Sequence, residues 1–198
     1  MADTNNTEGF IPPHGGYRKL ITYQKAEIIY DGTVYFTQRF FQKHESTIDQ
    51  MVQAARSGKH NIAEASMASA TSKETEIKLT NVARASLEEL KKDYEDFLRT
   101  RKLTLWDKDH KLSLRLRELN KTPDANYETF RKAIENPVPE ICANVMIGLI
   151  KIASYLLSNQ IKALEQAFII EGRLRERMTA ARINKRNKDN NNKQGRDP

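Results

Sequence analysis

The sequence predicts an all-α protein, an up-and-down antiparallel four-helix bundle. Charged residues make up 30% of the 198 residues and the AVILMFWYC set 38%, with only eight glycines and six prolines. This balance is typical of long helices. Apolar residues recur at three- and four-residue spacing in several long segments, which indicates amphipathic helices. Pro-Pro and Gly-Gly pairs precede the first of these segments, and Pro137 and Pro139 precede the last. The length suits one domain with a real core.

The chain divides into an arm, one helical domain and a tail. Residues 1–16 end in "FIPPHGG", whose Pro-Pro and Gly-Gly pairs predict an extended arm. We expect the four-helix-bundle domain over 17–171, with a suffix region at about 101–171. From residue 172 a basic helical segment leads into "NKDNNNKQGRDP", whose composition predicts disorder.

The first principal helix is expected over about 18–42 and is rich in aromatic side chains. These are Tyr17, Tyr23, Tyr30, Tyr35, Phe36, Phe40 and Phe41. Aromatic residues in a helix more often fill a core than form a platform for stacked bases. The cations near its start, Arg18, Lys19 and Lys25, are included among the candidate nucleic-acid contacts.

The second principal helix, about 47–69, carries two neighbouring stripes. One is apolar and the other consists of small side chains, with Gly58 between them. A glycine inside a helix costs about 1 kcal/mol relative to alanine, so we expect a close approach to a neighbour. The residues predicted for close packing, within the bundle or between subunits, are Gly58, Asn61, Ala65, Ala54 and Ala68.

His60 and Glu64 lie one turn apart on the remaining side of this helix. Such a pair could supply two metal ligands, but no third ligand has helical spacing to it, so an exposed ion pair or hydrogen bond is favoured. The four histidines are scattered, and no phosphate loop, Cys/His cluster or nucleophile motif is present. We therefore expect no enzymatic activity, no cofactor and no metal.

The third principal helix, about 72–100, has the clearest bundle pattern. Thr71 is predicted to cap it, with Glu74 reaching back to complete a capping box. Apolar residues then repeat at near-heptad spacing from Leu79 to Phe97. Trp106, the only tryptophan, follows and is expected to cover one end of the core.

Two short helices are expected before the fourth long one, near 111–119 and 124–135. Thr122 is predicted to cap the second of them, with Pro123 in its first turn.

The fourth principal helix, about 140–171, starts after "NPVPE", and Gly172 is its expected C-cap. Its first half is apolar almost all round and requires neighbours on several sides.

The chain shows no signature of secretion or of a membrane span. The apolar run 145–157 is too short to cross a bilayer and contains Lys151. "MADTNNTEG" lacks the basic and apolar regions of a signal peptide. A single cysteine, Cys142, excludes an intramolecular disulfide. We expect a cytoplasmic protein without membrane association.

The net charge of +7 is concentrated at the C-terminus, where residues 173–198 hold nine Lys and Arg against three Asp and Glu. Cationic segments are a common footprint of nucleic-acid binding, although basic tails also serve solubility. The candidate nucleic-acid contacts in this tail are Arg173, Arg175, Arg177, Arg182, Lys185, Arg186 and Lys188.

Two stretches, "MVQAARSGKHNIAEAS" and "KLTNVARASLEELKKDYEDFL", resemble the bacterial four-helix-bundle family of the 23S ribosomal RNA intervening-sequence proteins. The flanking "GYRKLITYQKAEIIYDGTVYF" and "EGRLRERM" are similar to its subgroup with a four-helix-bundle suffix domain. The resemblance covers about Gly16 to Met178. It implies an up-and-down bundle assembled as a homo-oligomer, commonly a ring-like homopentamer.

The same family includes the accessory variability proteins of diversity-generating retroelements, whose basic pentamers bind nucleic acid and a reverse transcriptase. The resemblance and the charge together favour a non-catalytic nucleic-acid-binding accessory factor, with RNA favoured over DNA and a reverse transcriptase as a possible partner. The alternative is a protein-binding oligomeric scaffold without a nucleic-acid role. An RNA-binding assay separates the two.

Overall fold

The computed structural model describes residues 15–42, 45–171, 179 and 182–187. Their elements are η1 (Tyr17–Lys19), α1 (Ile21–Phe40), α2 (Ser46–Ala68), α3 (Lys73–Thr100), α4 (Lys111–Asn120), α5 (Tyr127–Ile134) and α6 (Pro139–Glu171). Residues 182–187 are also helical, and the described residues contain no strand. The predicted all-α class is confirmed. The predicted arm up to residue 14 and the C-cap at Gly172 lie outside the described residues.

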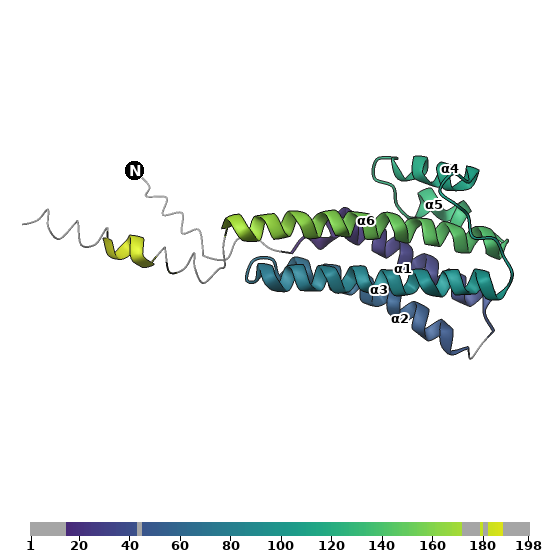
Figure 1. Ribbon diagram of the computed structural model, residues 1–198, viewed down its shortest axis with the longest axis horizontal. Coiled ribbons are helices and arrows are strands. Elements are labelled where there is room, and N and C mark those ends of the chain that lie inside the picture. The colour runs from purple at the N-terminus through teal and green to yellow at the C-terminus, as the bar shows by residue number, and fades with distance from the viewer. Residues whose placement is uncertain (1–14, 43–44, 172–178, 180–181, 188–198) are drawn as a thin grey trace, which may run out of the picture.

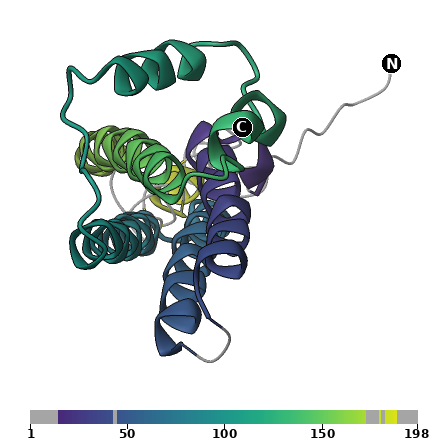
Figure 2. The same cartoon turned by 90° about the vertical axis from the view of Figure 1, so that its right-hand side faces the viewer.

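The four long helices contact one another in a closed ring: α1 packs on α2, α2 on α3, α3 on α6, and α6 on α1. The helices α3 and α6 run side by side along the long axis of the molecule (Figure 1). In the end-on view, α1 and α2 are inclined to that pair (Figure 2). The short helices α4 and α5 both pack on α6, and α5 also contacts α1.

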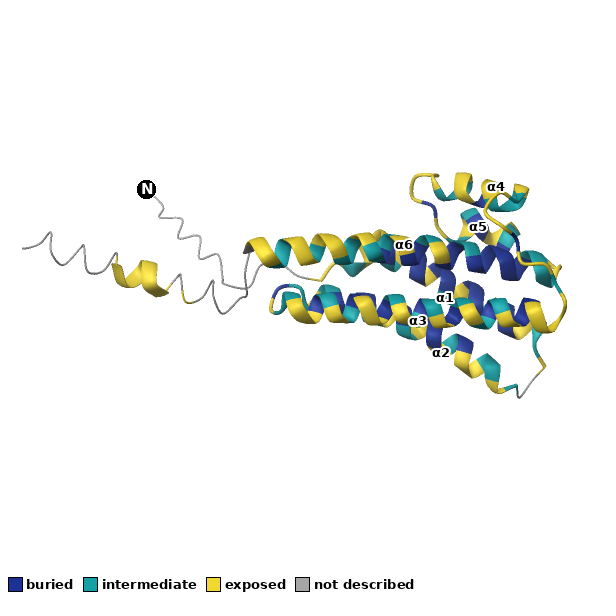
Figure 3. Cartoon of the chain, viewed as in Figure 1, coloured by how far each residue is buried: buried dark blue, intermediate teal, exposed yellow. Residues whose placement is uncertain are grey.

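The core is concentrated around the first half of α6 (Figure 3). Residues 142–147, 149 and 150 are all buried, and contacts reach α6 from α1, α3, α4 and α5. The requirement for neighbours on several sides of this half is therefore confirmed. The second half is far more open, because Tyr155 is 66% exposed and Ile169 and Ile170 are 80% and 84% exposed.

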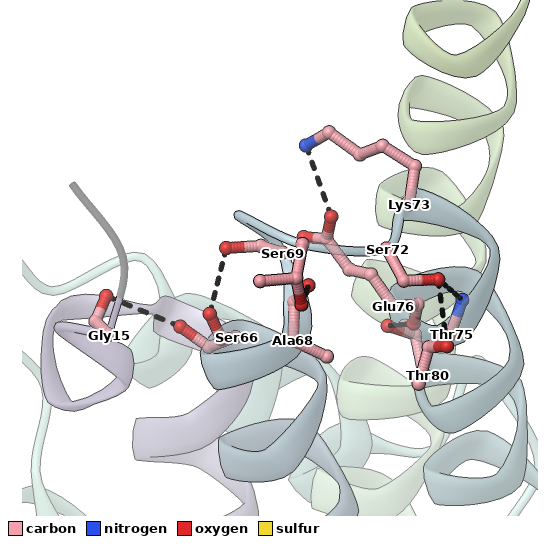
Figure 4. Close-up of polar contacts among 10 residues, drawn as sticks. Gly15, Ser66, Ala68, Ser69, Ser72, Lys73, Thr75, Glu76 and Thr80 are labelled. Atoms are coloured by element: carbon pink, nitrogen blue, oxygen red, sulfur yellow. Dashed lines mark hydrogen bonds and ion pairs between the residues drawn. The ribbon is translucent and has the colours of Figure 1, made fainter. Parts of the chain in front are cut away.

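The turn between α2 and α3 differs from the prediction by one residue (Figure 4). Ser72 caps α3, because its Oγ accepts a hydrogen bond from the backbone N–H of Thr75 at 3.1 Å. The hydroxyl of Thr71 donates instead to the carbonyl of Ala68 at 3.2 Å. The predicted capping box of Thr71 is therefore wrong, and Glu74 forms an ion pair with Lys78.

The short helix α5 also begins later than predicted. Asp124 has a positive φ of 53°, which interrupts any right-handed helix that would run on from Pro123. The cap is Asn126, which forms a capping box with Thr129. The predicted start of the first helix at residue 18 is likewise corrected, because the 3₁₀ turn η1 ends at Lys19, Leu20 has extended backbone, and α1 begins at Ile21.

The small-residue stripe of α2 packs against α3 within the same chain. A Cβ built on Gly58 would lie 2.8 Å from Cδ2 of Leu87, so the two helices approach where glycine leaves room. The hydroxyls of Ser57 and Ser86 are hydrogen bonded at 2.9 Å beside this contact. Among the other predicted residues, Ala54 and Ala65 are buried, and Asn61 and Ala68 are half-buried.

One helix among the described residues, α6, is long and apolar enough over Pro139–Ile170 to cross a membrane by length and composition. Buried core helices of soluble proteins pass the same test, and 61% of the most apolar part of α6 is buried inside this protein. The cytoplasmic location stays a prediction.

Candidate nucleic-acid interface and the pocket beside α4

The structure shows only part of the predicted cationic surface. Arg182, Lys185 and Arg186 are exposed in the helical segment 182–187, and Arg18 and Lys19 are exposed in η1. The other tail candidates, Arg173, Arg175, Arg177 and Lys188, lie outside the described residues.

The prediction for Lys25 is wrong. The residue is 3% exposed, and its Nζ lies 5.1 Å from the centroid of the Phe130 ring on α5. Burial lowers the pKa of this ammonium group, since a charge is costly to remove from water. The short helix α5 thus covers the side chain, and Lys25 has no surface to offer to a phosphate.

Arg18 lies in acidic surroundings. It lines a hollow of about 380 Å³ between α1 and the start of α5, together with four carboxylates, those of Glu27, Asp31, Asp124 and Glu128. Burial and Glu27 raise the pKa of Asp31, while Lys59 opposes the shift. The four carboxylates repel a phosphate, which carries the same sign of charge, so this hollow is a poor nucleic-acid contact despite its arginine.

A second cationic surface, which the sequence interpretation missed, lies between α4 and α6. Its framework begins at Trp106, whose backbone N–H donates to Oδ1 of Asn144 on α6 at 2.8 Å. The Trp106 ring is stacked on His110 at 4.4 Å, and Nδ1 of His110 accepts from the backbone N–H of Leu112 to cap α4. The predicted role of Trp106 as a cover is consistent with its 8% exposure.

The centre of α4 is seated on α6 by a contact at a glycine. Leu116 is 5% exposed and lies directly over Gly148, where a Cβ would overlap its Cδ2. Because α4 has its main packing contacts with α6, this contact sets the separation of the two helices. Hollows remain on both sides of α4.

The first hollow, which we call the α4–α6 pocket, has a volume of about 420 Å³. Its buried or half-buried lining is largely apolar and includes Leu116, Ile147, Gly148, Ile152 and Leu156. Its exposed members are Asp107, Lys108, Arg117, Lys151 and Tyr155. The pocket therefore combines an apolar interior with three cations, one carboxylate and an exposed phenol ring.

The hollow on the other side of α4, bounded also by α5, has a volume of about 490 Å³ and shares Trp106 and Leu116 with the first. Its lining includes Arg115 and Lys132 against Glu128. It has no exposed aromatic ring, because its tryptophan is nearly buried. It offers less for recognition than the α4–α6 pocket.

The thiol of Cys142 is enclosed in the core, although a free cysteine is a possible nucleophile. It is fully buried and donates to the carbonyl of Ile134 at 2.7 Å. Burial raises its pKa from 9.0 to about 12, so the thiolate is suppressed at neutral pH.

No group of three His, Cys, Asp or Glu side chains able to hold a metal ion occurs within the described ranges. His60 and Glu64 both lie exposed on α2. The expected lack of enzymatic activity stays a prediction.

Comparison of the chain with protein-family models, curated proteins and solved structures finds no match. The family resemblance therefore stays an expectation. The signal for Lys151 and Tyr155 was present as a polar pair four residues apart within the largely apolar run 145–157. Nothing in the sequence indicated that Lys108 and Arg117 would line the same pocket.

Proposed function

We propose that the chain is a non-catalytic RNA-binding accessory protein. One observation carries this proposal: residues 173–198 hold nine cationic side chains against three carboxylates, and the described members of the set are exposed to solvent. Exposed Lys and Arg bind the phosphate backbone and release its condensed counterions, which favours association without base recognition. The preference for RNA over DNA comes from the family resemblance.

The ring of contacts among α1, α2, α3 and α6 supports an up-and-down four-helix bundle as the body of this protein. We further propose a homo-oligomer, with five subunits and a reverse-transcriptase partner suggested by the resemblance. Two features that first favoured assembly are satisfied within one chain: the small stripe of α2 packs on α3, and the apolar half of α6 is covered. They no longer argue for subunit contacts.

A separate observation favours the second candidate function, a protein-binding oligomeric scaffold. At the end of α6, Ile169 and Ile170 expose 80% and 84% of their surface. Adjacent exposed isoleucines at a helix end suit a contact with another protein chain. This scaffold role requires no nucleic acid.

The test compares the full chain with a chain that ends at Gly172, using fluorescence anisotropy with structured and single-stranded RNA. The proposed function requires that the full chain binds RNA and that affinity falls as salt rises. A full chain that binds no RNA, yet forms oligomers, would favour the scaffold. Equal affinity and equal salt dependence of both chains would place the RNA site on the helical body.

A further inference from the structure

The α4–α6 pocket brings an exposed aromatic ring together with cations from three segments. Tyr155 is 66% exposed, and Lys151 lies one turn earlier on the same face of α6. Arg117 reaches the pocket from α4 and Lys108 from the loop before it. Asp107 is the one carboxylate in its lining. A ring flanked by Lys and Arg is the arrangement that binds single strands in unrelated folds.

We propose that the α4–α6 pocket binds an unpaired nucleotide of single-stranded RNA, an inference that rests on the proposed function. The base stacks on the Tyr155 ring, and the phosphates on either side of it contact Lys108, Arg117 and Lys151. Stacking on an aromatic side chain suits any base, because every base has a π face. The site therefore selects unpaired over paired nucleotides with little preference for sequence.

The size and lining of the pocket fit this occupant. A volume of about 420 Å³ falls in the range of roughly 300–1,000 Å³ that ligand pockets occupy. The apolar interior suits the faces of a base that enters the pocket. The exposed cations suit the phosphates on either side of that base, which stay in contact with water. A base inside a duplex is stacked on its neighbours and has no free face to present.

One unsatisfied polar atom adds to the chemistry of the pocket. Asn120 lines it, and Oδ1 of that residue is buried without a hydrogen-bond partner among the described residues. The amino groups of adenine, cytosine and guanine could donate the hydrogen bond that this oxygen does not receive.

The pocket and the tail can be tested by separate substitutions, because the described lining of the pocket lies before residue 157. Fifteen residues of α6 separate Leu156 from Glu171, which corresponds to about 22 Å at the rise of an α-helix. Trp106 is the only tryptophan of the chain and lines the pocket. Its fluorescence reports on occupancy of either hollow beside α4, so a change that Tyr155→Ala abolishes is assigned to the α4–α6 pocket.

The experiment uses the full chain and a labelled, unstructured RNA of about 12 nucleotides, within the range of single-strand sites. Tyr155→Ala should weaken binding by about 5- to 150-fold, since one stacked base contributes about 1–3 kcal/mol, and Tyr155→Phe should bind as the parent does. A triple variant, Lys108→Ala, Arg117→Ala and Lys151→Ala, should reduce the log–log salt slope by about 2. All four residues are exposed, so folding should be unaffected.

A matched probe, the same RNA with abasic residues throughout, keeps the phosphates and removes every base. The parent and Tyr155→Ala should bind the abasic RNA with equal affinity. The intact single strand should change the fluorescence of Trp106, whereas the abasic RNA and duplex RNA should not. If the full chain binds RNA but Tyr155→Ala and the triple variant match the parent, the pocket proposal fails and the proposed function stands.

Two other outcomes also overturn the proposal. A full chain that binds no RNA removes the proposed function and this inference together. A change in Trp106 fluorescence on adding dodecanoate that the triple variant lacks, with no change on adding the single strand, would assign the α4–α6 pocket to an anionic amphiphile instead.

Discussion

Gly58 and Leu87 pack so closely that a Cβ on residue 58 would lie 2.8 Å from Cδ2 and 3.0 Å from Cγ of Leu87. Both residues are buried, and the hydrogen bond between Ser57 and Ser86 lies one residue earlier on each helix. The glycine therefore permits a close approach of α2 to α3 at the centre of their contact. This approach offsets the helical propensity that glycine lacks.

We predict that Gly58→Leu lowers the free energy of unfolding by about 1–3 kcal/mol, because overpacking a tight contact forces side chains out of their favoured rotamers. Urea unfolding followed by circular dichroism measures the change. Gln53→Leu is the control, since Gln53 is exposed on the same helix. Adding Leu87→Ala to Gly58→Leu should recover part of the loss. Equal stability of the two leucine variants would contradict the close contact.

The positions of the long helices along the chain were largely predictable, because an apolar stripe with helical spacing must face a core. The predicted segments 47–69 and 72–100 match Ser46–Ala68 and Lys73–Thr100 within one residue at each end. The caps were less predictable. Thr71 and Ser72 both carry a hydroxyl, and the choice between them depends on backbone angles that side-chain patterns do not contain.

The candidate site was less predictable than the fold. In the sequence, Lys25 is one of several cations near the start of a helix and is not distinguished from the others. Only the position of α5 in the structure shows that it is covered. The α4–α6 pocket depends on how a loop near Lys108 lies against α6, which begins 31 residues later in the chain at Pro139. Helical periodicity describes contacts within an element and gives no distance between a loop and a remote helix.

We predict that Lys25→Met leaves RNA affinity and its salt dependence unchanged, because the side chain is buried beneath α5. Methionine keeps the apolar stem and removes a buried charge, so stability should be unchanged or higher. Fluorescence anisotropy and urea unfolding measure the two effects. A variant at an exposed cation, Lys19→Met, serves as the control. Weaker RNA binding by Lys25→Met would restore Lys25 as a contact.

The same variant should show a change in pH dependence. Burial lowers the native pKa of Lys25 below 10.5, so between the native and the usual pKa the unfolded chain binds more protons. Stability therefore rises with pH in that interval through this group. Lys25→Met should lack this contribution, and the difference in unfolding free energy between variant and parent should shrink as pH rises towards 10.5. An unchanged difference would show that the burial has no effect on the titration.

We predict that the Cys142 thiol reacts with a disulfide reagent at pH 8 only as fast as the protein opens. Burial raises its pKa to about 12, and the reactive species is the thiolate. The reaction should be complete within seconds in denaturant and slower by orders of magnitude in the native state. Rapid reaction of the native protein would show that the contact with the Ile134 carbonyl opens easily.

We predict that the protein forms a homo-oligomer. Light scattering should give a mass that is a multiple of 22.8 kDa, with a factor of five expected from the family resemblance. If the end of α6 makes subunit contacts, Ile169→Asn with Ile170→Asn should lower that mass without lowering helical content, because both residues are more than three-quarters exposed. A monomer at micromolar concentration would end the proposal of a homo-oligomer.

The salt dependence of RNA binding tests the tail. If about half of its nine cations engage phosphates, with roughly 0.7 counterions released per contact, the tail should contribute about −3 to the log–log slope for single-stranded RNA. Raising salt from about 50 to 200 mM should then weaken binding on the order of 10²-fold. Replacing Arg182, Lys185 and Arg186 with alanine should bring the slope closer to zero by up to about 2.

In an oligomer the tails act together, so removing residues 173–198 should cost more affinity than one tail supplies. The body should stay folded, because its buried core lies before residue 158. The loss should be similar for RNA with bases and for abasic RNA, since the tail contacts phosphates and has no aromatic residue. A larger loss of affinity for RNA that contains bases would contradict purely electrostatic binding by the tail. If removal of the tail leaves the log–log salt slope unchanged, the tail serves solubility alone.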